Sequence, residues 1–206
     1  MYNLRHNAAI TVITMATAVA VIIALTVSAP AGQGQTMAQN NDWGPKWTAE
    51  GELTLPTDYH QWVFLGSPLT PHALNGGAAP FPEYHNVYVH QTAFRAYRAT
   101  GEWPEGTILL KELQLTTPAT NPDGSSIEVS GRGYFPSARN GIDISVKDSR
   151  RFKESNGWGF FNFGHHAPPY AETAAAQPVE ACAGCHIANA DEMVFTKFYR
   201  PILDAK

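Results

Sequence analysis

Both cysteines of the 206-residue chain lie in a single pentapeptide, CAGCH, at residues 182–186. An exported domain that relies on disulfides normally spreads more cysteines through its sequence. This pair therefore has another purpose. Residues 51–206 must be stabilised by a hydrophobic core, and a segment of this length fits one domain with a core of ordinary size.

The C-x-x-C-H spacing is typical of the attachment site of a c-type haem. In that chemistry Cys182 and Cys185 each form a thioether with a vinyl group of the haem, and His186 is the proximal axial ligand of the iron. A zinc site needs about four ligands, and no second pair of ligands at zinc spacing is present. A redox C-x-x-C belongs beside a βαβ pattern, which is also absent. We expect one covalently bound haem c per chain.

The N-terminus resembles an export signal. Arg5 and His6 precede Ala8 to Ala29, a run without a charged residue, and Ala29-Pro30-Ala31 offers a cleavage site. The run is also long enough to span a bilayer, so residues 1–31 are a signal peptide or an uncleaved anchor. Either reading places the domain outside the cytoplasm, where c-type haem is attached. Residues 32–50, rich in Gly, Gln and Asn, suit a flexible lead-in.

The net charge of −4 and the lack of a basic patch argue against a nucleic-acid partner.

Turn residues separate short β-like runs along the rest of the chain. The pattern predicts a single α+β domain, mainly antiparallel sheet, with a long loop or irregular hairpin at 116–133. Strands are expected at 51–56, 60–66, 85–90, 107–115, 142–148 and 157–166. Helices are expected at 92–99, 171–177, from the CAGCH segment onward, and at about 191–200, ending near Pro201.

The strand TILLKELQL, residues 107–115, carries a lysine in an unexpected position. Side chains alternate between the two faces of a strand, so Lys111 lies between Leu109 and Leu113 on the leucine-rich face, which we expect to be buried. A buried ammonium is costly and usually has a partner, a lowered pKa or a chemical role. A β-bulge that shifts the alternation, or a lysine that reaches the edge of the sheet, would also explain the pattern.

The sixth ligand of the iron is not evident from the sequence. Met193 follows His186 too closely to reach the opposite face of the haem. The other candidates are Met37, His85, His90, His165 and His166. An electron carrier would need such a ligand, whereas a domain without one leaves the iron open for ligand binding or catalysis.

Several blocks of the chain, in order, resemble the cytochromes P-460. The resemblance covers about residues 50–206 and ends in the C-terminal C-x-x-C-H. The blocks are GELTLPTDYHQWVFLG, APFPEYHNVYV, AYRATGEWPEGTILLKEL, GRGYF, ISVKDSRRF and CAGCHIANADEMVFTKFY.

This resemblance implies a periplasmic c-type haem enzyme, a homodimer with a mostly antiparallel β fold. It implies that Lys111, in the family's G-T-x-x-x-K-E block, is bonded through its nitrogen to a meso carbon of the porphyrin. The implied reaction is oxidation of hydroxylamine to nitrous oxide or nitric oxide at an open distal site. Electrons would leave to an external acceptor such as a small soluble cytochrome c.

The resemblance also places Gln177 at a distal position where relatives have a carboxylate, which accepts protons more readily than an amide. Other distal or pocket-lining candidates are His85, Glu112, Arg132, Asp143, Phe81, Tyr134 and Phe135. The alternative function is that of the β-type cytochromes c′, which share the fold, lack the lysine bond and bind nitric oxide or carbon monoxide without turnover. Lys111 is the residue that discriminates between the two.

Overall fold

The computed structural model of the protein describes residues 42–205. The predicted signal or anchor at residues 1–31 and most of the predicted lead-in lie outside this range. No helix within the described residues combines the length and the apolar composition needed to cross a membrane.

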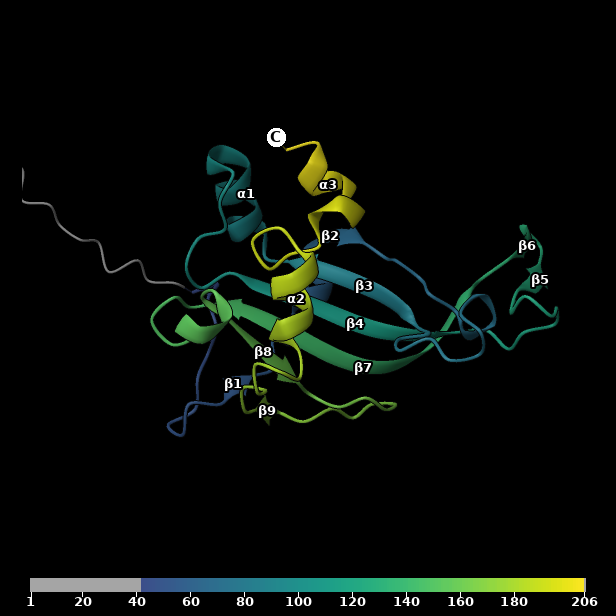
Figure 1. Cartoon of the computed structure of the whole chain (residues 1–206), viewed down its shortest axis with the longest axis horizontal. Helices are drawn as coiled ribbons and strands as arrows, with labels where there is room; N and C mark the ends of the chain where they lie inside the picture. The colour runs from purple at the N-terminus through teal and green to yellow at the C-terminus, as the bar shows by residue number, and fades with distance from the viewer. Residues whose placement is uncertain (1–41, 206) are drawn as a thin grey trace, which may run out of the picture. The chain divides into compact units, whose positions relative to one another are not determined.

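Short elements follow one another along the chain (Figure 1). The strands are β1 Leu53–Thr54, β2 Val63–Gly66, β3 Tyr84–Val89, β4 Ile108–Thr116, β5 Ser126–Glu128, β6 Gly131–Gly133, β7 Pro136–Lys147, β8 Trp158–Asn162 and β9 Thr173–Ala174. The α-helices are α1 Gln91–Thr100, α2 Ala183–Asn189 and α3 Arg200–Leu203, and the 3-10 helices are η1 Tyr59–Gln61, η2 His72–Leu74, η3 Lys153–Ser155 and η4 Thr196–Phe198.

The centre of the domain is a five-stranded sheet in the order β2-β3-β4-β7-β8. Every pair in it is antiparallel. Two further pairs, β1 with β9 and β5 with β6, form small two-stranded sheets. The β5–β6 hairpin lies beyond the N-terminal end of β7, away from the three α-helices (Figure 1). The predicted α+β class with a mainly antiparallel sheet is confirmed.

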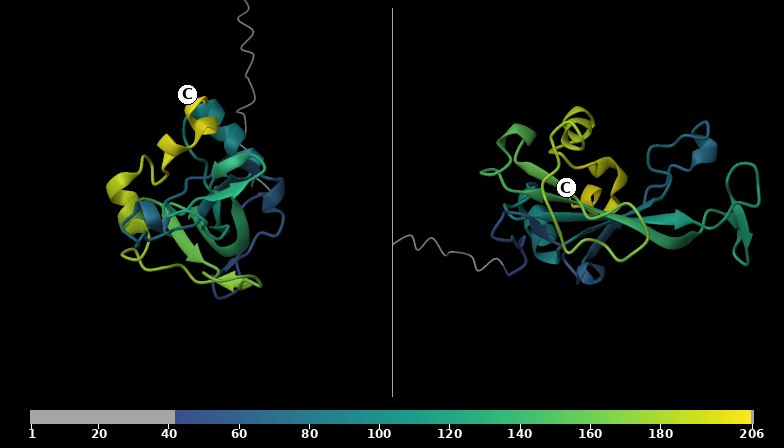
Figure 2. Two further views of the ribbon diagram at one scale, coloured as in Figure 1. Left: turned by 90° about the vertical axis from the view of Figure 1, so that its right-hand side faces the viewer. Right: turned by 90° about the horizontal axis from the view of Figure 1, so that it is seen from below.

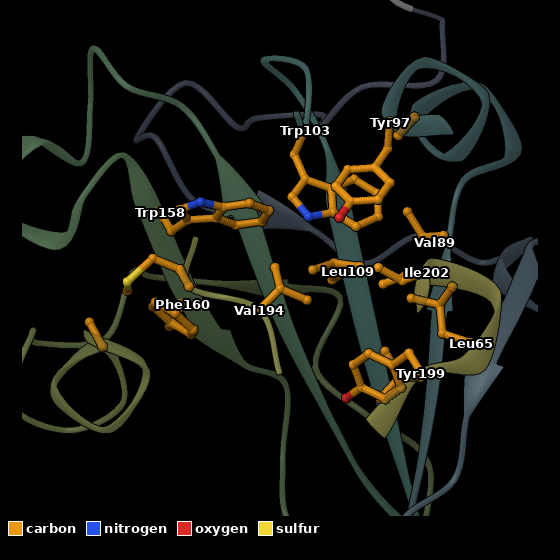
Figure 3. Packing of buried hydrophobic residues seen from close by; sticks show 14 residues of the cluster. Leu65, Val89, Tyr97, Trp103, Leu109, Trp158, Phe160, Val194, Tyr199 and Ile202 are labelled. Atoms are coloured by element: carbon orange, nitrogen blue, oxygen red, sulfur yellow. The ribbon is translucent and has the colours of Figure 1, made fainter. Parts of the chain in front are cut away.

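The three α-helices pack on one side of the central sheet, which we call the helix face. In the left-hand view of Figure 2, α1 and α3 lie at the top and the yellow segment that contains α2 lies to the left of the sheet. Strand residues such as Val89, Leu109 and Phe160 join side chains of α1, α2 and α3 in one buried cluster (Figure 3). Within this cluster the rings of Tyr97 and Trp103 stack with centroids 4.2 Å apart. This face carries most of the residues discussed below.

The other side of the sheet, the opposite face, has its own core. Ile108, Leu110, Ile144 and Phe161 belong to a second buried cluster with Leu53 and other residues of the flanking segments. The expected burial of the leucine-rich face of β4 is confirmed, and the face that carries Ile108 and Leu110 is buried as well. A central strand covered on both faces loses the apolar–polar alternation that marks a half-exposed strand.

Helix α1 forms as its sequence predicts. The His90 side chain accepts a hydrogen bond from the Thr92 backbone N–H at the start of the helix. Gly101 ends it with a φ of 80°, a left-handed conformation that glycine adopts without strain. Ala93 and Tyr97, four residues apart, are the buried positions, as expected for one face of a helix.

Two predicted helices are not formed. Residues 171–177 are extended and include β9, which pairs with β1. Backbone pairing with β1 outweighs the helical preference of this alanine-rich stretch. Residues 191–199 form turns and η4, and Pro201 lies in the first turn of α3 instead of ending a helix. Proline is well tolerated in the first turn, where its missing N–H would have no intrahelical partner.

The described part of the predicted lead-in contacts the domain. Trp43 stacks on His90 with ring centroids 5.8 Å apart. Trp47 pairs with Leu53 in an isolated bridge, and the Arg151 guanidinium lies 3.8 Å from its ring centroid. Aromatic side chains in this segment thus fix its path before β1 begins.

Candidate haem site

The CAGCH segment forms the beginning of α2. Cys182 precedes the first helical residue and is half-buried, whereas Cys185 is exposed. Neither is in a disulfide. In the turn that leads into α2, the Gly184 N–H donates to the carbonyl of Val179 at 2.9 Å. Both thiols are therefore presented by one compact turn, as attachment to a single macrocycle requires.

The His186 ring is held in one orientation. Its Nδ1–H donates to the backbone oxygen of Met193 at 2.7 Å. Phe160 and Phe195 pack against the imidazole with ring centroids 4.6 and 4.8 Å away. A hydrogen bond at Nδ1 leaves the lone pair on Nε2, which is how a carbonyl partner fixes the tautomer of a metal-binding histidine.

Burial lowers the pKa of His186, and the charge of Lys111 lowers it further, although the hydrogen bond to Met193 acts in the other direction. The result favours neutral imidazole, the form that binds iron. The side chains present therefore fit a c-type haem in their chemistry: two thiols, an oriented neutral imidazole and a nearby amine.

Lys111 points from β4 to the helix face. Its Nζ lies 3.0 Å from Asp143 Oδ2 and 4.4 Å from the centroid of the Phe81 ring. Asp143 is the register partner of Lys111 on β7, and its Oδ1 accepts a hydrogen bond of 2.7 Å from Asn162 on β8. The predicted inward direction of Lys111 is confirmed, with about a quarter of its side chain still exposed. No bulge alters the alternation of β4 between Ile108 and Leu113.

The charge of Lys111 affects the pKa values of two residues in the CAGCH segment. Burial raises the pKa of the Cys182 thiol, the charge of Asp143 raises it further, and the charge of Lys111 lowers it. Lys111 has the same lowering effect on the pKa of His186. The geometry agrees: Asp143, the partner of Lys111, is hydrogen-bonded to Asn162 of β8, and Phe160 of the same strand packs on His186. Lys111 and the CAGCH segment thus share the helix face, although some 70 residues of sequence separate the lysine from Cys182.

A second polar cluster lies beside Lys111. The buried Glu83 carboxylate accepts hydrogen bonds from His165 at 2.7 Å and Asn140 at 2.8 Å. Burial acts to raise the pKa of Glu83, but these hydrogen bonds outweigh it and hold the pKa below its usual value. Burial, aided by the charge of Lys111, lowers the pKa of His85 to about 4. Within residues 42–205, the buried His85 Nε2 has no hydrogen-bond partner.

The structure separates the candidates for a sixth ligand. Met193 is buried and its carbonyl holds His186, so it lies on the proximal side, as expected. His90 caps α1 and stacks on Trp43. His165 donates to Glu83, and the exposed His166 contacts its neighbour Ala167. Met37 lies outside the described residues.

Several distal candidates lie away from the helix face. Glu112 points to the opposite face, where the Tyr59 hydroxyl donates to it at 2.7 Å. Arg132 pairs with Asp123 at 2.7 Å in the segment around the β5–β6 hairpin. Tyr134 donates to the carbonyl of Asp123 in the same region, and the Phe135 ring lies against Gly133 of β6. These four side chains have structural partners of their own.

Gln177 lies beside β8. Its backbone N–H donates to the carbonyl of Phe160 at 2.7 Å. Its side chain lines a cavity of about 310 Å³ together with Phe160 and Ala183. No hydrogen bond of the Gln177 side chain is present in the described part of the chain, and the residues that line this cavity do not include Lys111.

The sequence did not single out the residues that orient His186. The role of the Met193 carbonyl depends on a backbone turn with a φ of 67°, which side-chain patterns do not reveal. Phe160 was within a predicted aromatic strand, and alternation along β8 was the only signal that could have assigned it to the helix face. Glu83 and His165 are 82 residues apart, with no local pattern to connect them.

The fold and the site define a β-rich domain with a C-terminal c-type haem motif. A family model for cytochrome P460 matches residues 56–196, and the chain belongs to this family. Membership makes it a c-type haem protein of the hydroxylamine-oxidising kind, with a haem-dependent oxidoreductase character. A search of curated proteins found no match.

Proposed function

We propose that the protein is a periplasmic enzyme that oxidises hydroxylamine to nitrous oxide or nitric oxide at an open distal haem site. In this proposal Cys182 and Cys185 attach one haem covalently and His186 is its axial ligand. Lys111 is bonded to the porphyrin. Electrons leave to an external acceptor such as a small soluble cytochrome c, and the working unit is a homodimer.

The main support for this proposal is that Lys111 and the CAGCH segment lie on the same face of the sheet. The lysine extends from the central strand to the face on which α2 lies, and its charge acts on both Cys182 and His186. A haem held by α2 would therefore have an amine at its edge. An amine in a partly apolar site, beside Phe81, is a competent nucleophile once it has lost its proton.

The chain's own residues have distinct roles. Phe160, Phe195 and the Met193 carbonyl hold the imidazole of His186 in a fixed orientation. A bound haem would supply the electron sink and the coordination position for hydroxylamine. The family resemblance assigns Gln177 to the distal side, where its amide would donate and accept hydrogen bonds with the substrate. It is a weaker proton acceptor than the carboxylate of relatives, so proton removal falls to another group.

The predicted export signal supports a location in the periplasm. Arg5 and the uncharged run from Ala8 to Ala29 have the form of an export signal, and c-type haem is attached outside the cytoplasm.

The experiment that tests the function compares wild type with Lys111→Ala in a host that matures c-type haem. Lys46→Ala, which removes an exposed lysine before β1, is the control. Wild type and control should show a strongly red-shifted ferrous Soret band and oxidise hydroxylamine. Lys111→Ala should keep haem on Cys182 and Cys185 but lose both properties. An ordinary c-haem spectrum in wild type would favour the gas-binding alternative.

A further inference from the structure

Asp143 is the direct partner of the Lys111 amine. The two residues are opposite one another in the β4–β7 pairing, and Nζ lies 3.0 Å from Oδ2. The side chains are 27% and 26% exposed. An ion pair that is about three-quarters buried contributes modestly to stability, and this one also places a carboxylate directly beside the amine.

The Asp143 carboxylate is held in place from its other side. Asn162, the next residue across the sheet, donates to Oδ1 at 2.7 Å. Oδ2 is thereby directed at Lys111, and the Phe81 ring lies 4.4 Å from Nζ. The amine is confined between a carboxylate and an aromatic ring, both on the helix face.

We propose that Asp143 positions Lys111 for attack on the porphyrin and accepts the proton that the amine loses. The inference rests on the proposed lysine–haem bond and names the group that makes its formation possible. An ammonium has no lone pair, so it cannot form the bond until a base has removed a proton. The carboxylate at 3.0 Å meets the distance requirement for such a base.

Formation of the lysine–porphyrin bond requires one external reagent, an oxidant. Lys111 Nζ forms a bond to a meso carbon of the porphyrin, and one N–H bond and the meso C–H bond break. Two electrons pass to an external two-electron oxidant of the peroxide class. The proton that activates the ammonium goes to Asp143 Oδ2, and the two protons from the broken bonds pass to solvent or to the reduced oxidant.

Neighbouring carboxylates are occupied elsewhere. Glu112 follows Lys111 in the sequence but points to the opposite face, where it accepts from Tyr59. Glu83 accepts hydrogen bonds from His165 and Asn140. His85 also lies near Lys111, but its buried Nε2 has no hydrogen-bond partner among the described residues and so does not contact the amine. Asp143 is the carboxylate in contact with the amine.

The test compares the holoproteins of wild type, Asp143→Asn and Asp143→Glu. Asp123→Asn is the matched control, because it removes the carboxylate of the Asp123–Arg132 ion pair in the segment around the β5–β6 hairpin. Intact-protein mass reports the cross-link, since its formation removes the mass of two hydrogen atoms beyond haem attachment. The ferrous Soret position and the circular dichroism spectrum are recorded on the same samples.

In Asp143→Asn we expect haem on both cysteines, an ordinary c-type spectrum and a cross-linked fraction lower by about tenfold or more, since a general base contributes about 100-fold or more to a rate. Asp143→Glu should recover part of the cross-link, and Asp123→Asn should match wild type. The isosteric asparagine keeps an acceptor for Asn162, so the fold should be unchanged.

Four results would overturn the inference. One is full cross-linking of Asp143→Asn, and another is an Asp143→Glu variant as deficient as Asp143→Asn. The third is a loss of haem attachment in Asp143→Asn, which would assign the residue to attachment instead, and the fourth is an altered circular dichroism spectrum in that variant, which would assign it to folding. A wild-type protein without the cross-link would refute the lysine–haem bond itself, which separates failure of the proposed function from failure of the inference about Asp143.

Discussion

The imidazole of His186 is fixed by a backbone carbonyl seven residues further along the chain, where Nδ1 lies 2.7 Å from the oxygen of Met193. The Met193 backbone turns with a φ of 67° to present this carbonyl. Its side chain is at the same time part of the core on the helix face. The orientation of the proposed axial ligand therefore depends on packing as well as on one hydrogen bond.

The first prediction concerns that packing. Met193→Ala should lower the free energy of unfolding by about 2–4 kcal/mol, because it leaves a cavity where a side chain only 3% exposed now packs. Urea unfolding of the holoprotein measures the effect. Ile187→Ala, which shortens a side chain 45% exposed on α2, should change the free energy by less than about 0.5 kcal/mol. Equal losses in both variants would contradict the packing role of Met193.

Glu112 provides the second prediction, since it neighbours Lys111 but faces the other way. Glu112→Ala removes the acceptor of the Tyr59 hydroxyl, and a buried group left without its partner costs about 1–3 kcal/mol. Unfolding in urea should show this loss, while the Soret band stays as in wild type. Glu128→Ala, which removes an exposed carboxylate on β5, should be neutral. A changed Soret band in Glu112→Ala would contradict the separation of the two faces.

The third prediction addresses the close approach of β7 to the segment after β8. A Cβ on Gly141 would lie 2.9 Å from the Gly164 carbonyl oxygen and 3.1 Å from Leu113 Cδ1. Gly141→Ala should therefore destabilise the protein by about 1–3 kcal/mol, the usual cost of overpacking. Gly133→Ala, where the nearest atom is a ring carbon of Phe135 at 3.6 Å, should be tolerated. Equal thermal midpoints for the two variants would show that the segment moves aside freely.

The fourth prediction is a pH dependence that originates at His85. Burial and the Lys111 charge lower its pKa from 6.5 to about 4 in the folded protein. Between these values the unfolded chain binds the proton more readily, so stability falls as pH falls from about 6.5 to 4 and levels off below. The loss should be on the order of 1–2 kcal/mol after allowance for solvent screening.

Thermal unfolding at pH 7 and pH 5 tests this dependence in His85→Gln. The variant should lose part of the difference between the two pH values, because its side chain does not titrate. His166→Gln, which alters an exposed histidine, is the control and should keep the full difference. An unchanged pH dependence in His85→Gln would assign the effect to other groups.

Local patterns predicted much of the site. The C-x-x-C-H spacing identified Cys182, Cys185 and His186, and the structure presents them from one turn at the start of α2. Alternation along residues 107–115 predicted the direction of Lys111, because the period of a strand is two wherever no bulge intervenes. The stop of α1 at Gly101 followed from the same kind of local rule.

Tertiary context decided what the sequence left open. Residues 171–177 have helical composition, yet pairing with β1 and β8 holds them extended. The contacts of Asp143 with Lys111 and Asn162 join three strands, and no pattern within one strand reveals them. Burial of both faces of β4 likewise depends on segments distant in sequence, such as β1 with Leu53.

The alternation of side chains along β4 also restricts which insertions and deletions the strand can accept. Lys111 and Glu112 are consecutive, and they project to opposite faces of the sheet. A deletion of one residue between Thr107 and Lys111 would place the acid at the proposed haem edge, and an insertion of one residue would turn Lys111 to the opposite face. Only changes by an even number of residues preserve the arrangement, so related sequences should vary in length in the loops that flank β4 and not within the strand.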